Sequence, residues 1–284
     1  MKTGLVMEGG AMRGLFTAGV TDVMIERGLT FDGAIGVSAG AVFGCNFKSR
    51  QNGRCLRYNM KYGKDRNYCS FYSLLTTGNI YGTELCYRRI PEELDPFDTK
   101  AFEENPMPFY VVCTDVRTGR PIYHRVYRGD REEMDWFRAT ASMPLVSRIV
   151  RIDGQLLLDG GIADSIPLRY FQRAGYERNV LILTQPADYV RQPNRLQPAI
   201  AAMYARYPAF VKASATRHVR YNRDTAYIRA EAEAGRAFVI QPAESLHIAH
   251  TENDQGELLR VYELGRAAAE EKWDALCAFM ERDS

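Results

Sequence analysis

A serine at position 38 has the sequence surroundings of a catalytic nucleophile. It lies at the centre of Gly36-Val37-Ser38-Ala39-Gly40, which fits the pattern Gly-x-Ser-x-Gly. A nucleophile on a tight turn between a strand and a helix has crowded neighbours, and glycines two positions away remove the Cβ atoms that would clash. The pentapeptide alone is common by chance, but here a strand pattern precedes it and a helical pattern follows it. The segment therefore predicts nucleophilic attack by Ser38 on an acyl group.

A glycine-rich loop near the amino terminus could hold the negative charge that such an attack creates. Its sequence is Gly9-Gly10-Ala11-Met12-Arg13-Gly14, between the first apolar run and the first helical pattern. Backbone N–H groups at the start of a helix have no internal acceptor and can bind an anion. We expect them, together with the Ala39 N–H, to bind the oxyanion of a tetrahedral intermediate, where one donor is typically worth about 2.7–4 kcal/mol. Taken alone, the loop fits a simple connecting turn equally well.

An aspartate at the end of a buried strand is the candidate base. Asp159-Gly160-Gly161 follows the fully apolar run Leu156-Leu157-Leu158. Buried strands in α/β sheets point their ends toward clefts, and two glycines allow close backbone approach. Asp153 precedes Gly154 in a hairpin turn instead and is expected on the surface. An ordinary aspartate is a poor base at neutral pH, so we expect burial to raise the pKa of Asp159 and to place it within hydrogen-bond reach of Ser38.

The apolar pattern places these pieces on a parallel sheet. Strands are predicted at 5–7 and 31–37, and helices at 12–28 and 38–49. This strand–helix–strand–helix order is typical of a parallel sheet covered by helices. We therefore expect a single domain over residues 1–284, a three-layer α/β/α structure with a central, mostly parallel sheet.

The rest of the chain is patterned less evenly. Residues 50–105 mix aromatic, basic and polar types, with one plausible helix near 85–90. Farther along, the pattern predicts two hairpins, two more strands and a terminal helix, at 109–126, 148–158, 180–183, 238–240 and 256–282. We expect the middle segment to be a partly helical insertion in the α/β domain.

Taken together, the three motifs resemble the patatin-like phospholipase family, and its bacterial members most. The loop with Arg13-Gly14, the serine motif about 25 residues later and the distant Asp-Gly-Gly occur in the family's order. The likeness continues through Ala141-Ser142-Met143-Pro144, Asp164-Ser165-Ile166-Pro167 and the 180–184 strand. It implies a hydrolase that cleaves carboxylic esters of lipids through an acyl-serine, using a Ser-Asp dyad without histidine, metal or organic cofactor.

The resemblance also assigns roles to individual residues. Ser38 is the nucleophile and Asp159 the base, and the oxyanion hole is shaped by Gly9, Gly10 and Ala11. The residues that support these motifs are Arg13, Gly14, Gly36, Gly40, Gly160 and Gly161. The family usually has a glycine where Ala11 stands. A Cβ is harmless there at negative φ and obstructive at positive φ, so Ala11 bears on the geometry of the donors and not on the fold.

Two other functions stay open on the sequence. A Ser-acid-His triad of the α/β-hydrolase type needs a histidine after the acid, and His218, His247 and His250 meet that order, unlike His124. That fold normally builds several strands before its serine, whereas two precede Ser38 here, so the dyad is favoured. The second alternative is a non-catalytic protein that binds phosphate or a dinucleotide with the Gly9–Gly14 loop. Ala11 interrupts the Gly-x-Gly-x-x-Gly pattern that this function requires.

Composition excludes several classes of protein. Lys+Arg 37 against Asp+Glu 35 leaves a net charge of +2, which argues against a dedicated nucleic-acid binder. Apolar runs stay well below 18 residues, and Glu8 interrupts the first, so neither a membrane-spanning helix nor a secretory signal is expected. Six scattered cysteines without Cys-x-x-Cys spacing indicate free thiols in a cytoplasmic protein. They are Cys45, Cys55, Cys69, Cys86, Cys113 and Cys277.

Two basic, aromatic segments suggest peripheral contact with the inner membrane surface. Residues 48–66 contain seven basic residues, one acid and interleaved tyrosines, which suits anionic head groups, although a solvated basic helix face is the simpler interpretation. Residues 204–229 are similar and would form either a lid or a helix packed by its aromatic stripe. The head group, the acyl length and the oligomeric state are not determined by the sequence.

Overall fold

A mixed sheet of eight strands forms the centre of the molecule. The structure, a computed structural model, describes residues 1–281. The sheet order is β5-β6-β3-β2-β1-β7-β8, with β4 on β3. Neighbours in the run β3-β2-β1-β7-β8 are parallel, and the pairs β3–β4, β3–β6 and β5–β6 are antiparallel. The strands are β1 (Thr3–Met7), β2 (Gly33–Val37), β3 (Phe109–Asp115), β4 (Pro121–Val126), β5 (Val150–Ile152), β6 (Gln155–Asp159), β7 (Arg178–Ile182) and β8 (Ala237–Ile240).

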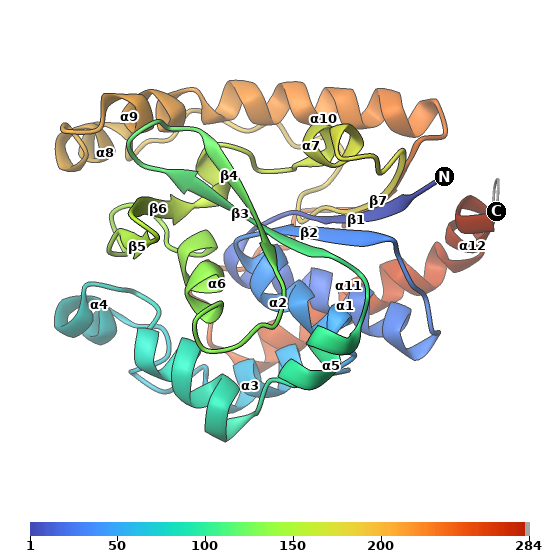
Figure 1. Cartoon of the computed structure of the whole chain (residues 1–284), viewed down its shortest axis with the longest axis horizontal. Helices are drawn as coiled ribbons and strands as arrows, with labels where there is room; N and C mark the ends of the chain where they lie inside the picture. The colour runs from blue at the N-terminus through green and yellow to red at the C-terminus, as the bar shows by residue number, and fades with distance from the viewer. Residues whose placement is uncertain (282–284) are drawn as a thin grey trace.

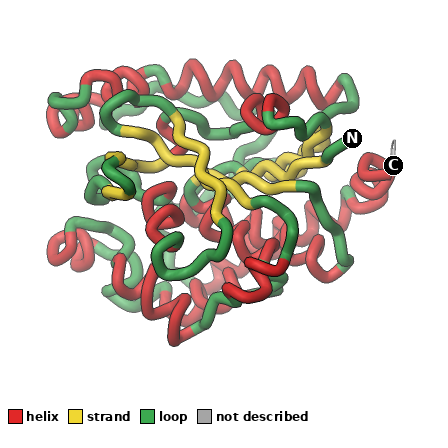
Figure 2. Tube along the Cα trace, viewed as in Figure 1, coloured by secondary structure: helices red, strands yellow, loops and turns green. Residues whose placement is uncertain are grey.

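Helices cover both faces of this sheet (Figure 1). One face packs against α1 (Gly14–Glu26), α2 (Ala39–Lys48) and α11 (Gln255–Glu271), and the other against α7 (Leu168–Arg173) and α10 (Arg217–Glu233). Because side chains alternate along a strand, Leu5 and Met7 of β1 enter the first core while Val6 enters the second. Figure 2 shows the strands enclosed between the two helical layers. The predicted three-layer α/β/α architecture is confirmed.

The register of three neighbouring strands brings the two candidate catalytic residues to one place. Val37, which precedes Ser38, pairs with Val112 of β3. The next residue of β3, Cys113, pairs with Asp159 at the end of the antiparallel strand β6. The carboxyl end of β6 therefore returns to the level at which β2 ends. Two strand pairings thus bring Ser38 and Asp159 together, although they lie about 120 positions apart in the chain.

Most of the predicted elements form, with two differences. The hairpins, the later strands and the first two helices lie close to their expected places. The predicted terminal helix is instead two helices, α11 and α12 (Trp273–Glu281), which meet at Lys272. The Lys272 Nζ donates to the carbonyl oxygen of Val239 in β8 at 3.0 Å, which anchors the junction to the sheet. The last residue of that prediction, 282, lies outside the described residues.

The middle segment is more helical than its pattern predicts. It contains α3 (Arg54–Tyr62), α4 (Phe71–Thr77), the π-helical η2 (Leu85–Leu94) and α5 (Thr99–Glu104). The remaining short helices are η1 (Ala11–Arg13), α6 (Met134–Thr140), η3 (Gly160–Ile162), α8 (Gln197–Met203) and α9 (Pro208–Ala215). Residues 204–229 contain α9 and most of α10, not one helix. Phe210 of α9 is buried in one core cluster and Tyr221 and Ile228 of α10 in another, so both are packed helices.

The basic stretch 48–66 is only partly a solvated face. Lys48 is buried, and its Nζ donates to the carbonyl oxygens of Met107 at 2.7 Å and Asn105 at 3.0 Å. Arg54 is also buried and donates to the carbonyl oxygen of Asp95 at 2.6 Å. These two cations hold the insertion against α2 and are not available to lipid head groups. Within residues 1–281, no helix has both the length and the apolar character needed to cross a membrane.

Candidate active site

Ser38 occupies a strained turn between β2 and α2. Its φ of 52° and ψ of −125° lie in a region that costs a non-glycine residue about 1–3 kcal/mol. The turn is tight enough to require the flanking glycines: a Cβ at Gly36 would lie 2.5 Å from the Ala41 Cα, and one at Gly40 would lie 2.4 Å from the Met7 carbonyl oxygen. The strained serine between two obligatory glycines has the geometry of a nucleophile elbow.

Asp159 ends β6 and is buried beside Ser38. Its Oδ1 accepts a hydrogen bond of 2.8 Å from the Gly161 N–H, and its own N–H donates to the Ser142 carbonyl oxygen at 2.8 Å. Burial raises the pKa of the Asp159 carboxyl, and Arg217, the Ser38 hydroxyl and the Gly161 N–H oppose this rise. Ser38 and Asp159 line the same cavity, and the Ser38 side chain lies near enough to the carboxyl to affect its pKa. The structure brings these two predicted residues together.

The glycines after Asp159 are required by close neighbours. A Cβ at Gly160 would lie 2.0 Å from the carbonyl oxygen of Val112, and a Cβ at Gly161 would lie 2.8 Å from Nη2 of Arg217. The first glycine lets β6 end against β3. The second leaves room for the guanidinium that faces the carboxylate.

The glycine-rich loop lies directly against the serine turn. A Cβ at Gly9 would come within 2.8 Å of the Ser38 Cβ, and one at Gly10 within 2.8 Å of the Thr184 Oγ1. The Thr184 hydroxyl donates to the Gly9 carbonyl oxygen at 3.1 Å, which fixes the loop. The N–H groups at the start of η1 have no acceptor inside that helix. Gly9, Gly10 and Ala11 line the same cavity as Ser38 and Asp159.

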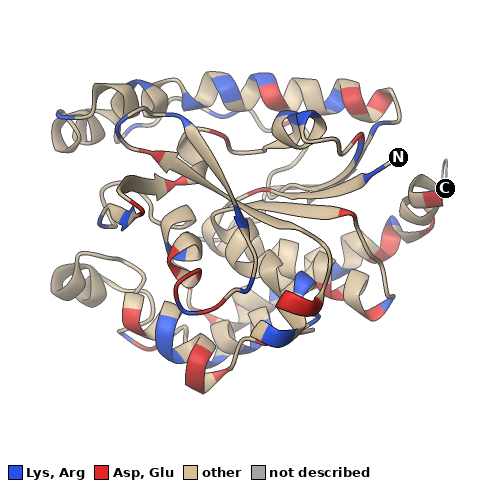
Figure 3. Cartoon of the chain, in the orientation of Figure 1, with Lys and Arg blue, Asp and Glu red and all other residues tan. Residues whose placement is uncertain are grey.

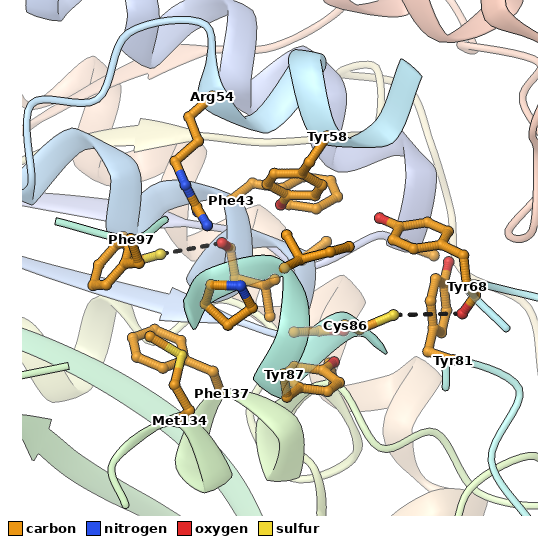
Figure 4. A pocket seen from close by; sticks show the side chains of 18 of the residues that line it. Phe43, Arg54, Tyr58, Tyr68, Tyr81, Cys86, Tyr87, Phe97, Met134 and Phe137 are labelled. Carbon is orange, nitrogen blue, oxygen red and sulfur yellow. Dashed lines mark hydrogen bonds between the residues drawn. The ribbon is translucent and has the colours of Figure 1, made fainter. Parts of the chain in front are cut away.

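Two cavities of different character meet at Ser38. The larger, of about 950 Å³, is lined by both catalytic candidates, the glycine-rich loop and several arginines. The smaller, of about 90 Å³, is mostly apolar, although the buried Arg54 also lines it. Figure 4 shows its aromatic wall, in which Phe43, Tyr58, Tyr87 and Phe137 project into one space from separate elements. Ser38 and Ala11 line both cavities, so a reacting group at the serine has access to each.

A family model described as patatin-like phospholipase matches residues 5–171, which is more than half of the chain. The chain belongs to the patatin-like phospholipase family. A second model, described as a domain of unknown function (DUF6363), matches residues 207–281 of this patatin-like protein, where α10, β8, α11 and α12 lie.

Several curated proteins are similar to this patatin-like chain. The uncharacterized protein YjjU of Escherichia coli is 30% identical over 66% of this chain and 54% of its own length. The uncharacterized NTE family protein Rv1063c of Mycobacterium tuberculosis is 28% identical over 59% of this chain and 44% of its own length. Lysophospholipase nte1 of Aspergillus terreus is 27% identical over 61% of this chain and 11% of its own length. The chain therefore spans about half or less of the relatives that it matches.

Among solved structures, the crystal structure of VipD from Legionella pneumophila is similar to this chain. The comparison gives a TM-score of 0.48 at 12% identity, and it covers 96% of this chain and 67% of VipD.

Ala11, the departure from the family's usual glycine, has a positive φ of 50°. A side chain in this left-handed region costs about 1–2 kcal/mol, so the patatin-like loop carries strain that a glycine would not have. The obstructive case predicted from the sequence is therefore the one present here. Ala11 nevertheless still lines both cavities.

Two histidines of this patatin-like protein make their contacts with residues other than Ser38 and Asp159. His124 stacks on Trp136 with ring centroids 3.7 Å apart, and the His250 Nε2 lies 3.3 Å from the Arg13 Nη1. His218 lines the large cavity, whereas His247 lines neither. Across residues 1–281, no group of three or more His, Cys, Asp or Glu side chains could hold a metal ion.

Sequence reasoning missed three residues that shape the site. The Thr140 hydroxyl accepts a 2.9 Å hydrogen bond from the Ser38 N–H, across 102 positions of the chain. Arg191 and Arg217 line the large cavity, and their charges oppose the rise that burial causes in the pKa of Asp159. None of the three belongs to a motif. The only sequence signal was the unusual density of arginine in 204–229, which includes Arg217.

Proposed function

We propose that this protein is a serine hydrolase that cleaves carboxylic esters of lipids with a Ser38–Asp159 dyad. The observation that carries the proposal is the buried Asp159 carboxyl beside a strained Ser38, with both side chains lining one large cavity. Family membership and the name of the lysophospholipase relative support lipid esters as the substrate class. No metal or organic cofactor is required by this chemistry.

Asp159 acts as the general base. It takes the proton of Ser38 while the serine Oγ attacks the ester carbonyl carbon. The tetrahedral intermediate then breaks its bond to the alcohol, and Asp159 returns the proton to the leaving oxygen. Water attacks the acyl-serine in the second half, with the same carboxylate as base. The bond to the serine Oγ then breaks, Asp159 returns the proton to Ser38, and the carboxylic acid leaves. The raised pKa of Asp159 makes it a stronger base than an exposed aspartate.

The oxyanion is held by backbone donors of the glycine-rich loop and of Ala39. Gly9, Gly10 and Ala11 border the cavity at the serine, where their N–H groups can meet a developing negative charge. The Ser38 N–H is not one of these donors, because Thr140 already accepts it at 2.9 Å. The amino end of α2 adds its dipole at the same point.

The acyl group enters the small aromatic cavity. That cavity opens at Ser38 and has an apolar wall, which suits a hydrocarbon chain and disfavours a charged head group. The alcohol portion of the substrate then occupies the larger, polar cavity on the other side of the serine.

The two alternative functions have less support. In a Ser-acid-His triad a histidine would stand between the serine and the acid, whereas Asp159 here faces Ser38 directly. A protein that only binds a dinucleotide would have no use for a strained serine next to a buried carboxylate. We also propose that residues 1–284 act as one domain, since β8 extends the same sheet as β1.

Contact with a membrane is proposed at α4. Phe71 and Leu75 are 79% and 85% exposed, and Figure 3 shows this helix without charged residues. Phe71 also lines the large cavity, together with the exposed Val190 and Leu196. An apolar rim at the entrance would insert into a lipid surface and align the cavity with a substrate.

Liposome pelleting tests the membrane contact. The double variant Phe71→Ser/Leu75→Ser should lose most of its binding to vesicles. The matched control is Leu264→Ser, which changes an exposed leucine of α11 outside both cavities and should bind as the wild type does. Equal binding by the wild type and the double variant would refute contact through α4.

Covalent labelling tests the hydrolase itself. A fluorophosphonate should add to Ser38 in the wild type, as mass spectrometry of peptides would show. Ser38→Ala should abolish both labelling and the hydrolysis of a short-chain nitrophenyl ester. Asp159→Asn should reduce hydrolysis by at least about a hundredfold, within the usual range for loss of a general base. The exposed Ser245→Ala serves as the control. Near-wild-type rates in Ser38→Ala or Asp159→Asn would exclude the dyad.

A further inference from the structure

The large cavity beside Ser38 is lined by arginines from three separate segments. Arg13 comes from η1, Arg191 and the exposed Arg195 from the loop after β7, and Arg217 from the first turn of α10. Among the described residues that line this cavity, Glu8 and Asp159 are the acidic ones. The wall therefore carries more positive than negative charge, although the whole chain has a net charge of only +2.

Both acids are occupied by other partners. The Glu8 Oε1 accepts from the Tyr221 hydroxyl at 2.8 Å, and its Oε2 accepts from the Thr184 N–H at 2.7 Å. Asp159 accepts from Gly161 and faces Ser38. Within residues 1–281, neither acid forms an ion pair with an arginine of the cavity.

The arginines also have unused donors. The Nε atoms of Arg13 and Arg191 and the Nδ1 of His218 are buried and have no hydrogen-bond partner among residues 1–281. The Arg217 Nε has one weak contact, a donation to the Ser165 Oγ at 3.4 Å. All of these side chains line the one cavity. Buried polar atoms in proteins are normally paired, so two arginines of one cavity wall with an unpaired Nε favour a ligand that accepts hydrogen bonds.

The arginines are held in place and repel one another. The Arg191 guanidinium lies over the Tyr221 ring at 4.4 Å, and the Arg191 backbone exchanges hydrogen bonds of 2.9 and 3.0 Å with the Asn222 side chain. Burial and the charge of Arg191 lower the pKa of Arg217 to about 10. Burial is the largest cause of the lowered pKa of Arg13; the charge of Glu8 opposes this fall and the charge of Arg191 adds to it. A bound anion would offset this repulsion.

We infer that Arg13, Arg191 and Arg217 form a binding site for the phosphate of the substrate's head group, and that the enzyme prefers phospholipids with a net negative head group over zwitterionic ones. This inference rests on the proposed function. Guanidinium groups present paired donors that match the oxygens of a phosphate. The quaternary ammonium of a zwitterionic head group would meet this positive wall, with both nearby carboxylates already occupied.

Binding of a soluble head group tests the site apart from catalysis. sn-Glycerol 3-phosphate is titrated calorimetrically into wild type and into Ser38→Ala, and both should bind. Arg191→Gln should raise the Kd about tenfold or more, and Arg191→Lys should lie between. The matched control, Arg120→Gln, removes an exposed arginine outside the cavity and should bind as the wild type does. The proposed site would be refuted if glycerol phosphate showed no saturable binding to the wild type, or if Arg191→Gln bound it with the same affinity.

A substrate comparison tests the preference. Dihexanoyl phosphatidic acid, phosphatidylglycerol and phosphatidylcholine are compared below their critical micelle concentrations, so that no charged surface contributes. The wild type should favour the two anionic lipids about tenfold or more, and Arg191→Gln should bring that ratio close to one. Equal rates on all three lipids would refute the assignment of this site to the head group. Binding of glycerol phosphate would in that case indicate a site for free phosphate. Binding without hydrolysis of any ester supports the anion site and refutes the proposed function instead.

Discussion

The hydroxyl of Thr140 holds the backbone of Ser38 in its strained turn. It accepts a 2.9 Å hydrogen bond from the Ser38 N–H and donates to the carbonyl oxygen of Val112 in β3. The nucleophile is therefore tied to the strand that also pairs with β6, the strand ending in Asp159. Thr140 is a positioning residue, since it acts through Ser38.

Replacement of this hydroxyl should slow the reaction. Thr140→Val keeps the shape of the side chain but leaves the Ser38 N–H without its acceptor, so the serine loses its fixed orientation. We expect kcat for a nitrophenyl ester to fall between about tenfold and a hundredfold, with a smaller change in KM. Thr140→Ser restores the hydroxyl and should recover most of the rate. An unchanged kcat in Thr140→Val would show that the turn is held without it.

The acid limb of the pH profile should depend on Arg217. Burial raises the pKa of Asp159, and the charge of Arg217 opposes that rise. The carboxylate must be charged to accept the serine proton, so activity falls as the pH drops through this raised pKa. Arg217→Gln should raise the pKa further and move the acid limb of kcat/KM to higher pH. Arg217→Lys should leave it near the wild-type position. A limb that stays in place in Arg217→Gln would contradict the assignment of Asp159 as the base.

The buried carboxylate should also lower the stability of the fold. A raised pKa means that the folded state holds a proton more tightly than the unfolded state, so the free energy of unfolding falls as pH rises through that window. Asp159→Asn removes this charge while keeping an oxygen for the Gly161 N–H. We expect a higher Tm than wild type at neutral pH and a smaller difference at acidic pH. A lower Tm at neutral pH would contradict this. Asp153→Asn, in an exposed turn, is the control.

Ala11 offers a test of strain in the oxyanion loop. Its φ of 50° favours glycine, so Ala11→Gly should stabilise the fold by about 1 kcal/mol and should keep or raise kcat. Ala215→Gly, at an exposed position of α9, should have the opposite effect and cost about 0.5–1 kcal/mol. Urea unfolding of both variants gives the comparison. A loss of stability in Ala11→Gly would mean that the methyl group contributes more through packing than it costs through φ.

Local sequence patterns predicted the elements around Ser38 and singled out Asp159. The apolar periodicity of 5–49 predicts two strands and two helices, and β1, α1, β2 and α2 lie close to those places. The Gly-x-Ser-x-Gly spacing predicts a tight turn because the steric demand is local. Asp159 could be distinguished from Asp153 because only one of them ends an apolar strand.

The rest depends on contacts that a single sequence does not display. The insertion packs through Arg54 and Asp95, 41 positions apart, so its short helices have little periodicity of their own. The Ser38–Thr140 bond and the gathering of Arg13, Arg191 and Arg217 join segments that share no spacing rule. Such residues come together only after the sheet order is fixed.

The size of the small apolar cavity should set the preferred length of the acyl chain. A single position allows this cavity to be made both smaller and larger. Val42 of α2 is half-buried and lines the apolar cavity next to Ser38. Val42→Phe would fill that space, so hydrolysis of an octanoyl ester should fall about tenfold or more while that of an acetyl ester changes little. Val42→Ala enlarges it and should shift the preference toward longer chains. The measurement is kcat/KM across nitrophenyl esters of increasing chain length, with the phosphate affinity of each variant as the control. If both substitutions lowered kcat/KM by the same factor for esters of every chain length, the acyl chain would have to lie elsewhere. The larger cavity would then have to hold both parts of the substrate.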